Sequence, residues 1–191
     1  MNKRYLFLWM ISILKPLEYP LLPLRLIVKL NECLNKEIIL FEYGCGYSTL
    51  WFNKLCKCYS VEHNPIWYKK LKNKGIKNLK LHTKKKNYIN SIDDVKSKID
   101  IVFVDGVYRN ECLKKAESRI ENGILILDDA NRFEYNTWWL DKKYESAVFG
   151  GLKMNSTFNS KGYFEINNTK VWHITKNEKK NQHISYNSIF L

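Results

Sequence analysis

The sequence predicts an α/β protein with a Rossmann-like three-layer sandwich, in which a mainly parallel sheet lies between two layers of helices. From Ile38 onward, short runs rich in Ile, Val and Leu alternate with longer stretches of helical spacing. This alternation is typical of βαβ units. Two of the runs, Ile99–Val104 and Gly123–Leu127, are almost continuously apolar and each is followed by Asp, as expected for buried parallel strands.

The individual elements follow from the same pattern. Five runs predict strands: Ile38–Tyr43, Cys58–Glu62, Leu79–Thr83, Ile99–Asp105 and Gly123–Asp128. The stretches between them carry apolar residues at helical spacing and predict four helices: Ser48–Leu55, Pro65–Lys74, Ile89–Lys98 and Arg109–Glu121. Two later runs enclose a polar stretch with two glycines and predict an antiparallel pair at one sheet edge: Glu145–Phe149 and Lys170–Thr175.

Length and hydropathy predict one domain over residues 38–176, because 191 residues with 45% hydrophobic content can bury one substantial core. We expect residues 1–37 to form a helical segment that packs on this domain, and the polar residues 177–191 to be a mobile or loosely docked tail. The apolar run Tyr5–Leu14 has the length of a signal peptide, so a signal or membrane anchor is the alternative. No small-x-small cleavage site follows it, and no stretch approaches the roughly 20 apolar residues of a membrane span.

The cysteine content favours a reducing compartment, and we expect a cytoplasmic protein. There are five cysteines, an odd number in a chain long enough to fold without disulfides. Cys56 and Cys58 have no second pair of Cys or His at a zinc-like spacing, so we assign no metal to them.

The net charge of +13 is compatible with a nucleic-acid or acidic-membrane partner. Most of the excess, however, comes from Lys residues at solvent-type positions, which are dense from Lys69 to Lys86. This distribution favours a solvated basic face and leaves a nucleic-acid partner as the alternative.

A glycine turn follows the first predicted strand and leads into a predicted helix, in the segment Phe41 to Thr49. Gly44 and Gly46 allow the backbone to approach a ligand, and free amides at a helix start favour a negatively charged group. A dinucleotide site would usually have a small residue where this chain has Thr49. Glu42, two residues before the first glycine, can accept hydrogen bonds from the turn or from an ammonium group. Glu62, at the second strand end, can accept both hydroxyls of a ribose.

The segments E-Y-G-C-G-Y-S-T-L-W and S-V-E-H, together with V-F-V-D-G-x-x-R and G-I-L-I-L-D-D, resemble the class I S-adenosylmethionine-dependent methyltransferase family. The last two segments, and the upstream L-E-Y-P, resemble a bacterial small-molecule subgroup. The resemblance covers roughly Ile38 to Arg132 and, more loosely, extends to Thr175. It implies a seven-stranded sheet. The alternative is a Rossmann-like domain that binds another nucleotide or no ligand.

Carried over to this chain, the resemblance implies S-adenosylmethionine as the cofactor. The turn would hold the methionine part, Glu62 the ribose, and His63 would flank the adenine, with Trp67 as a further candidate contact. The implied cofactor-binding residues are Glu42, Tyr43, Gly44, Cys45, Gly46, Ser48, Glu62, His63, Asp105 and Gly106.

Acidic residues follow the fourth and fifth predicted strands and should meet at one edge of the sheet. Asp128 or Asp129 is a candidate general base, and Arg109 a candidate for holding an acidic substrate through its planar guanidinium. Asp105, Asp128 and Asp129 also resemble the three-ligand magnesium site of catechol-type and macrolide-sugar O-methyltransferases. The segment from Asp105 to Asp128 is shorter than in those families, which argues against magnesium. The identity of any metal therefore stays unknown.

We therefore expect a methyltransferase that acts on a small-molecule acceptor, with O-methylation of a hydroxyl as the leading reaction. The alternatives are an RNA methyltransferase, which the charge would favour, and a non-catalytic nucleotide-binding protein.

Overall fold

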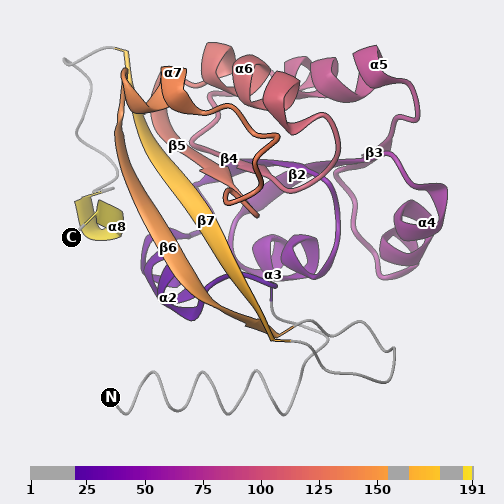
Figure 1. Cartoon of the computed structure of the whole chain (residues 1–191). Helices are drawn as coiled ribbons and strands as arrows, with labels where there is room; N and C mark the ends of the chain where they lie inside the picture. Colours follow the sequence, from indigo (N-terminus) through magenta and orange to yellow (C-terminus); the bar gives the residue numbers. More distant parts are fainter. Residues whose placement is uncertain (1–19, 155–163, 177–186, 191) are drawn as a thin grey trace.

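A mainly parallel sheet forms the centre of the computed structural model, which describes residues 20–154, 164–176 and 187–190. Its seven strands lie in the order β3-β2-β1-β4-β5-β7-β6 (Figure 1). Their bounds in that order are Leu79–Leu81, Lys57–Glu62, Ile39–Tyr43, Ile101–Val104, Asn122–Leu127, Phe164–Thr175 and Glu145–Met154. The first five strands of the chain pair in parallel, whereas β7 is antiparallel to both β5 and β6. The predicted Rossmann-like sheet with an antiparallel edge pair is confirmed.

The edge pair is longer than the sequence predicts. β6 continues through Gly150 and Gly151, which pair with Asn168 and Asn167 of β7. The polar, glycine-containing stretch was expected to end both strands. In an antiparallel edge pair, however, backbone hydrogen bonds between strands do not require apolar side chains on both faces.

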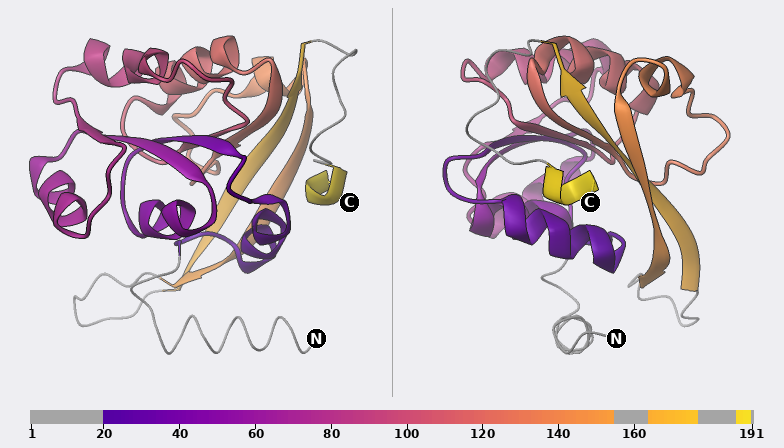
Figure 2. Two further views of the ribbon diagram at one scale, coloured as in Figure 1. Left: turned by 180° about the vertical axis from the view of Figure 1, so that it is seen from behind. Right: turned by 90° about the vertical axis from the view of Figure 1, so that its left-hand side faces the viewer.

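Helices cover both faces of the sheet (Figures 1 and 2). One face packs on α2 (Leu24–Cys33) and α3 (Tyr47–Leu55), and α4 (Pro65–Asn73) lies beside it against β3. The other face packs on α5 (Lys85–Asn90), the 3-10 turn η1 (Ser91–Asp94), α6 (Arg109–Arg119) and α7 (Trp138–Asp141). Successive strand residues therefore enter different cores, as the two-residue period of a strand requires. Leu40, for example, belongs to the first core and Phe41 to the second.

The prediction of a helix over Ile89–Lys98 is wrong in its bounds. The helix instead spans Lys85–Asn90 and continues as the short turn η1, after which Val95 is extended. The buried residues Tyr88 and Ile92 are four positions apart and share one face. The lysines that precede Tyr88 are exposed. In the sequence, such a run of lysines is typical of a solvated loop, which is why the predicted helix began too late.

The described parts of the two terminal segments pack on the sheet domain. In α2, Leu26, Ile27 and Leu30 are buried. The short helix α8 (Asn187–Phe190) lies against α2 and buries Ile189. The predicted apolar helix at Tyr5–Leu14 and most of the polar tail lie outside the described residues. Within the residues that are described, no helix has both the length and the apolar character needed to cross a bilayer.

Candidate functional site

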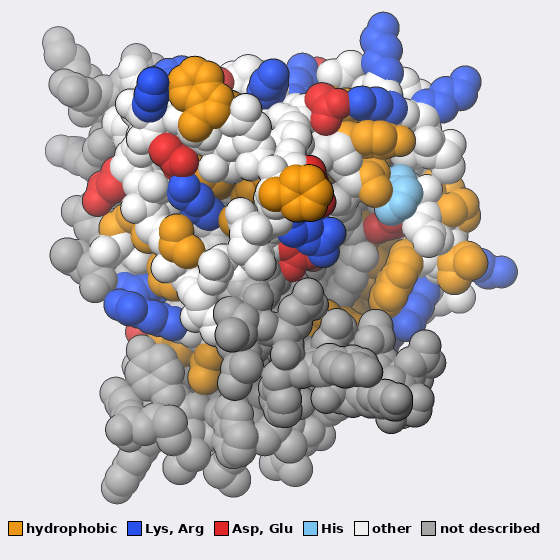
Figure 3. Space-filling view, viewed as in Figure 1, with side chains coloured by type: hydrophobic (Ala, Val, Ile, Leu, Met, Phe, Trp, Pro, Cys, Tyr) orange, Lys and Arg blue, Asp and Glu red, His pale blue; other side chains and the backbone are white. Residues whose placement is uncertain are grey.

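A hollow of about 310 Å³ lies at the carboxyl ends of β1, β2 and β4, where ligands bind in open parallel sheets. Figure 3 shows this face of the molecule, which is hollowed beside a His side chain and carries acidic and hydrophobic side chains around it. The hollow is lined by the following residues: Gly44, Cys45, Glu62, His63, Asn64, Trp67, Asp105, Gly106 and Val107.

The structure brings together six of the predicted cofactor-binding residues in this hollow: Gly44, Cys45, Glu62, His63, Asp105 and Gly106. Glu42, Tyr43, Gly46 and Ser48 are not part of its lining. Asn64 and Val107 are added by the structure. Asn64 had a sequence signal that the prediction did not use, because an Asn before Pro65 is typical of a helix N-cap. Its side chain accepts a hydrogen bond from Ile66 N, 2.9 Å away.

Gly44 and Gly106 bring the ends of β1 and β4 into direct backbone contact beneath the hollow. Gly44 has a φ of 87°, in the left-handed region that favours glycine. A Cβ atom on Gly44 would lie 2.5 Å from Gly106 Cα. A Cβ atom on Gly106 would lie 2.0 Å from the Tyr88 hydroxyl and 2.9 Å from Gly44 Cα. These glycines therefore keep the floor of the hollow free of side chains.

Glu42 lies behind the glycine turn rather than on the wall of the hollow, and its side chain is completely buried. Its carboxylate accepts hydrogen bonds from three hydroxyls: Ser48 at 2.5 Å, Thr49 at 2.7 Å and Ser60 at 2.9 Å. The same Thr49 hydroxyl accepts a hydrogen bond from Gly46 N at 2.9 Å. Glu42 thus joins β1, the start of α3 and β2, and it supports the turn without facing a ligand.

Burial raises the pKa of Glu42 to about 7, because a buried carboxylate loses its hydration. The three hydroxyl donors oppose this shift, and the negative charge of nearby Glu62 adds to it. Glu42 is therefore a group that titrates near neutral pH inside the folded protein.

Glu62 connects the turn after β1 to the end of β2. Its Oε2 accepts a hydrogen bond from Cys45 N at 2.8 Å, and its Oε1 accepts from His63 N at 2.8 Å and from Asn64 N at 2.7 Å. A carboxylate offers about four acceptor positions. His63 Nδ1 also lies 2.9 Å from Oε1. Among these contacts, Oε2 has the amide of Cys45 alone and keeps one acceptor position for a further donor, whereas the sequence predicted that Glu62 accepts two hydroxyls.

Aromatic side chains form one wall of the hollow. The rings of Trp67 and Tyr47 meet edge to face with their centroids 6.2 Å apart, and Lys70 Nζ lies 4.5 Å from the Trp67 ring centroid. On the neighbouring side, the half-exposed His63 ring meets Tyr88 edge to face at 6.1 Å. Trp67 and His63 thus place two planar rings beside Glu62, and Lys70 lies over one face of the Trp67 ring.

The three predicted aspartates and Arg109 meet at the rim of the hollow. Arg109 is buried, and its guanidinium donates to the carbonyls of Gly106, Asp128 and Asp105. It also donates to Asp105 Oδ1 at 3.0 Å. Because these donors are used within the chain, Arg109 is poorly placed to hold an acidic substrate.

The two candidate bases after β5 also differ in accessibility. The Asp128 side chain is completely buried and accepts a hydrogen bond from Thr169 Oγ1 at 2.7 Å. Asp129 is partly accessible and accepts a hydrogen bond from Arg132 at 2.6 Å. Among the three aspartates, only Asp105 lines the hollow.

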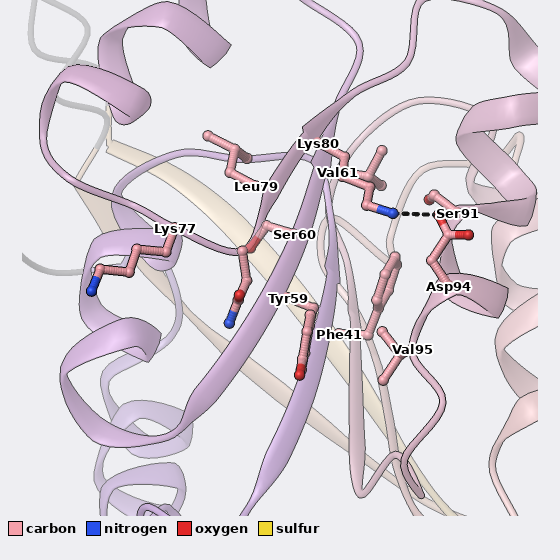
Figure 4. Close-up of a pocket in the computed structure, with 11 residues that line it drawn as sticks. Phe41, Tyr59, Ser60, Val61, Lys77, Leu79, Lys80, Ser91, Asp94 and Val95 are labelled. Atoms are coloured by element: carbon pink, nitrogen blue, oxygen red, sulfur yellow. Dashed lines mark hydrogen bonds and ion pairs between the residues drawn. The ribbon is translucent and has the colours of Figure 1, made fainter.

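A second hollow, of about 240 Å³, lies between β2, β3 and η1 (Figure 4). Its walls are mostly apolar and include Phe41, Tyr59 and Val95. Lys80 and Asp94, which also line it, form an ion pair of 2.7 Å. This hollow contains neither of the glycines of the turn nor any rim aspartate, so we do not assign the function to it.

Comparison with solved structures identifies the fold. A precorrin-6y C5,15-methyltransferase from Geobacter metallireducens GS-15 is similar, with 19% sequence identity, a TM-score of 0.53 and coverage of 78% of this chain and 87% of that chain. An rRNA methylase from Streptococcus thermophilus has 16% identity and a TM-score of 0.54, with coverage of 78% and 93%. Magnesium protoporphyrin IX methyltransferase from Synechocystis PCC 6803, solved with bound S-adenosylmethionine, has 15% identity and a TM-score of 0.51, with coverage of 78% and 74%.

This is the methyltransferase fold. In this chain, the hollow lies at the ends of β1, β2 and β4 of the seven-stranded sheet. No protein-family model matches the sequence, and no curated protein matches it. The methyltransferase fold of this chain is therefore established by its structure, and at these identities the acceptor has to be inferred from the site.

The glycine contact predicts unequal effects of two alanine substitutions. Gly44→Ala should lower the free energy of unfolding by more than about 2 kcal/mol, because it combines a left-handed backbone with a backbone clash. Gly46→Ala should cost less than about 1 kcal/mol, because a Cβ there meets no atom within 4 Å. Urea denaturation measures both values. Equal losses in the two variants would contradict the proposed close approach of β1 and β4.

The raised pKa of Glu42 predicts that the free energy of unfolding depends on pH. The pKa of this carboxyl is higher in the folded protein than in the unfolded chain, so the folded state holds its proton more tightly between pH 4.5 and about 7. The contribution of Glu42 should therefore decline as the pH rises through this window, by about 3 kcal/mol in total. Urea denaturation of the wild type and Glu42→Gln at pH 5 and pH 8 isolates this contribution. The same pH dependence in both proteins would contradict it.

Proposed function

We propose that this protein is an S-adenosylmethionine-dependent methyltransferase that transfers a methyl group to a hydroxyl of a small molecule. The observation that carries the proposal is the hollow, in which a side-chain-free floor, a carboxylate and an aromatic wall lie at the ends of adjacent parallel strands. This arrangement provides separate places for the amino-acid, ribose and base parts of one ligand.

The chemistry of the residues in the hollow fits this cofactor. Gly44 and Gly106 form the floor, and a Cβ atom on either one would clash with the backbone of the other. Glu62 accepts a ribose hydroxyl, and His63 and Trp67 contact the base. When bound, S-adenosylmethionine supplies an electrophilic methyl group, and the protein has to align the acceptor and remove its proton.

Asp105 is the best-placed residue for accepting that proton. Its side chain is about one-third exposed and lines the hollow, whereas Asp128 is completely buried. A general base must lie within hydrogen-bonding reach of the acceptor. We therefore propose Asp105 as the base in place of Asp128 or Asp129.

RNA is a second candidate acceptor, favoured by the net charge of +13. The lysines of α4 and of the segment that leads into α5 are exposed. The rRNA methylase from Streptococcus thermophilus shares the fold. Two further lysines of this region, Lys80 of β3 and Lys85 of α5, pair with Asp94 and Glu111. These pairs reduce the unbalanced positive charge of the region, so the small-molecule acceptor remains our proposal.

A cytoplasmic location is part of this proposal. All five cysteines lie in the described part of the chain. Cys56, Cys58 and Cys112 are buried, and thiols persist in a reducing compartment.

Cofactor identity can be tested by calorimetric titration with S-adenosylmethionine and with NAD. We expect binding of the first and not of the second. Glu62→Ala should weaken the binding by about 1–3 kcal/mol through the loss of a charged hydrogen bond. Asp94→Ala, which removes a surface carboxylate outside the hollow, is the matched control and should leave the affinity unchanged. Preference for NAD would refute the cofactor assignment, and full affinity in a folded Glu62→Ala variant would refute the ribose contact.

Acceptor class can be tested with S-adenosylmethionine that carries a tritiated methyl group. The protein is incubated with a low-molecular-weight cell extract and, separately, with total RNA at low salt. We expect label in the small-molecule fraction. Asp105→Asn should lower the transfer at least about 100-fold with little change in cofactor affinity. Label in RNA alone would favour the second candidate, and a large loss of cofactor affinity in Asp105→Asn would make Asp105 a cofactor residue instead of the base.

A further inference from the structure

Three acidic side chains and one arginine lie together at the carboxyl ends of β4 and β5. One oxygen atom from each of Asp105, Asp128 and Asp129 lies within 4.8 Å of the others. Such a group of hard oxygen atoms is chemically suited to a divalent cation. The guanidinium of Arg109 lies directly against it, 3.0 Å from Asp105 Oδ1 and 3.6 Å from Asp129 Oδ2.

Backbone carbonyls fix the guanidinium in this place. Its Nε lies 2.8 Å from Gly106 O, one terminal nitrogen lies 2.6 Å from Asp128 O, and the other lies 2.9 Å from Asp105 O. Displacing the buried guanidinium would leave these carbonyls without their donor, which is costly in a buried site. A divalent ion would have to displace it to reach the same carboxylates. The residues present therefore do not fit magnesium.

The backbone on both sides of this group is strained. Tyr108, which precedes Arg109, and Asp129 have φ values of 57° and 52°. They are the two non-glycine residues with positive φ in the described part of the chain. Such conformations persist where surrounding contacts stabilise them. Here, the contacts of Arg109 with both strand ends provide that stabilisation.

We propose that the Arg109 guanidinium takes the place of the divalent ion that the three aspartates would otherwise bind. The guanidinium balances the negative charge and holds the ends of β4 and β5 together. Arg109 is thus a positioning residue. The inference concerns the rim alone and does not depend on the proposed cofactor or acceptor.

The test measures the thermal unfolding of the full chain in MgCl2 or MnCl2 at constant ionic strength, and in EDTA. The wild-type melting temperature should respond to neither the ions nor the chelator. Arg109→Met should melt at a lower temperature and then gain about 2–4 °C on addition of either ion, because a ligand that binds the folded state stabilises it. This gain should vanish in the double variant Arg109→Met, Asp105→Asn.

Two further variants separate this role from a purely structural one. The first variant, Arg119→Met, removes another arginine of α6, whose guanidinium donates to Val95 O at 2.7 Å and lies near Asp93. This variant should lose stability without gaining an ion response. Arg109→Lys keeps a cation at the rim and should show no ion response. If Arg109→Met does not fold, the wild type and Arg109→Lys decide the question. The proposal is overturned by wild-type stabilisation that Asp105→Asn abolishes, by an ion response in Arg109→Lys, or by a folded Arg109→Met that binds no ion.

Discussion

The buried carboxylate of Glu42 is the interaction on which the geometry of the hollow depends. Its three hydroxyl partners come from the start of α3 and from β2, so one side chain sets the position of the glycine turn relative to two neighbouring elements. A buried carboxylate is stable only when such donors surround it. Glu42 therefore holds the glycine turn from the side that faces away from the hollow, and the other side of the turn stays open to a ligand.

The acidic residues at this end of the sheet have different partners and hence different roles. Glu42 binds hydroxyls, Glu62 binds backbone amides, and Asp105 faces a guanidinium. The hydroxyls and amides are neutral donors that support each carboxylate in one orientation, whereas the guanidinium also supplies charge. In the hollow, the Glu62 carboxylate can thus accept a hydrogen bond from a neutral polar group. At the rim, the negative charges of the aspartates are largely balanced by arginine side chains of the same chain.

The order of strands and helices along the chain and the glycine turn after the first strand could be predicted from the sequence, because buried strands and glycine turns leave local patterns. The strand before Gly44 and the strand ending at Glu62 are examples. Interactions between distant segments leave no such pattern. The hydroxyl shell of Glu42 includes Ser60, 18 residues away, and the orientation of Arg109 is set by a carbonyl of Asp128, 19 residues away. Glu42 and Arg109 were therefore expected to face a ligand, whereas neither side chain lines the hollow.

The most direct measurement of the central claim is a crystal structure of the protein with S-adenosylhomocysteine. We expect the amino-acid part of the ligand to lie above Gly44 and Gly106, one ribose hydroxyl to bind Glu62, and the base to lie between His63 and Trp67. We also expect the Glu42 carboxylate to keep its three hydroxyl partners with no contact to the ligand. A ligand bound elsewhere, or a direct contact between Glu42 and the ligand, would contradict this account of the site.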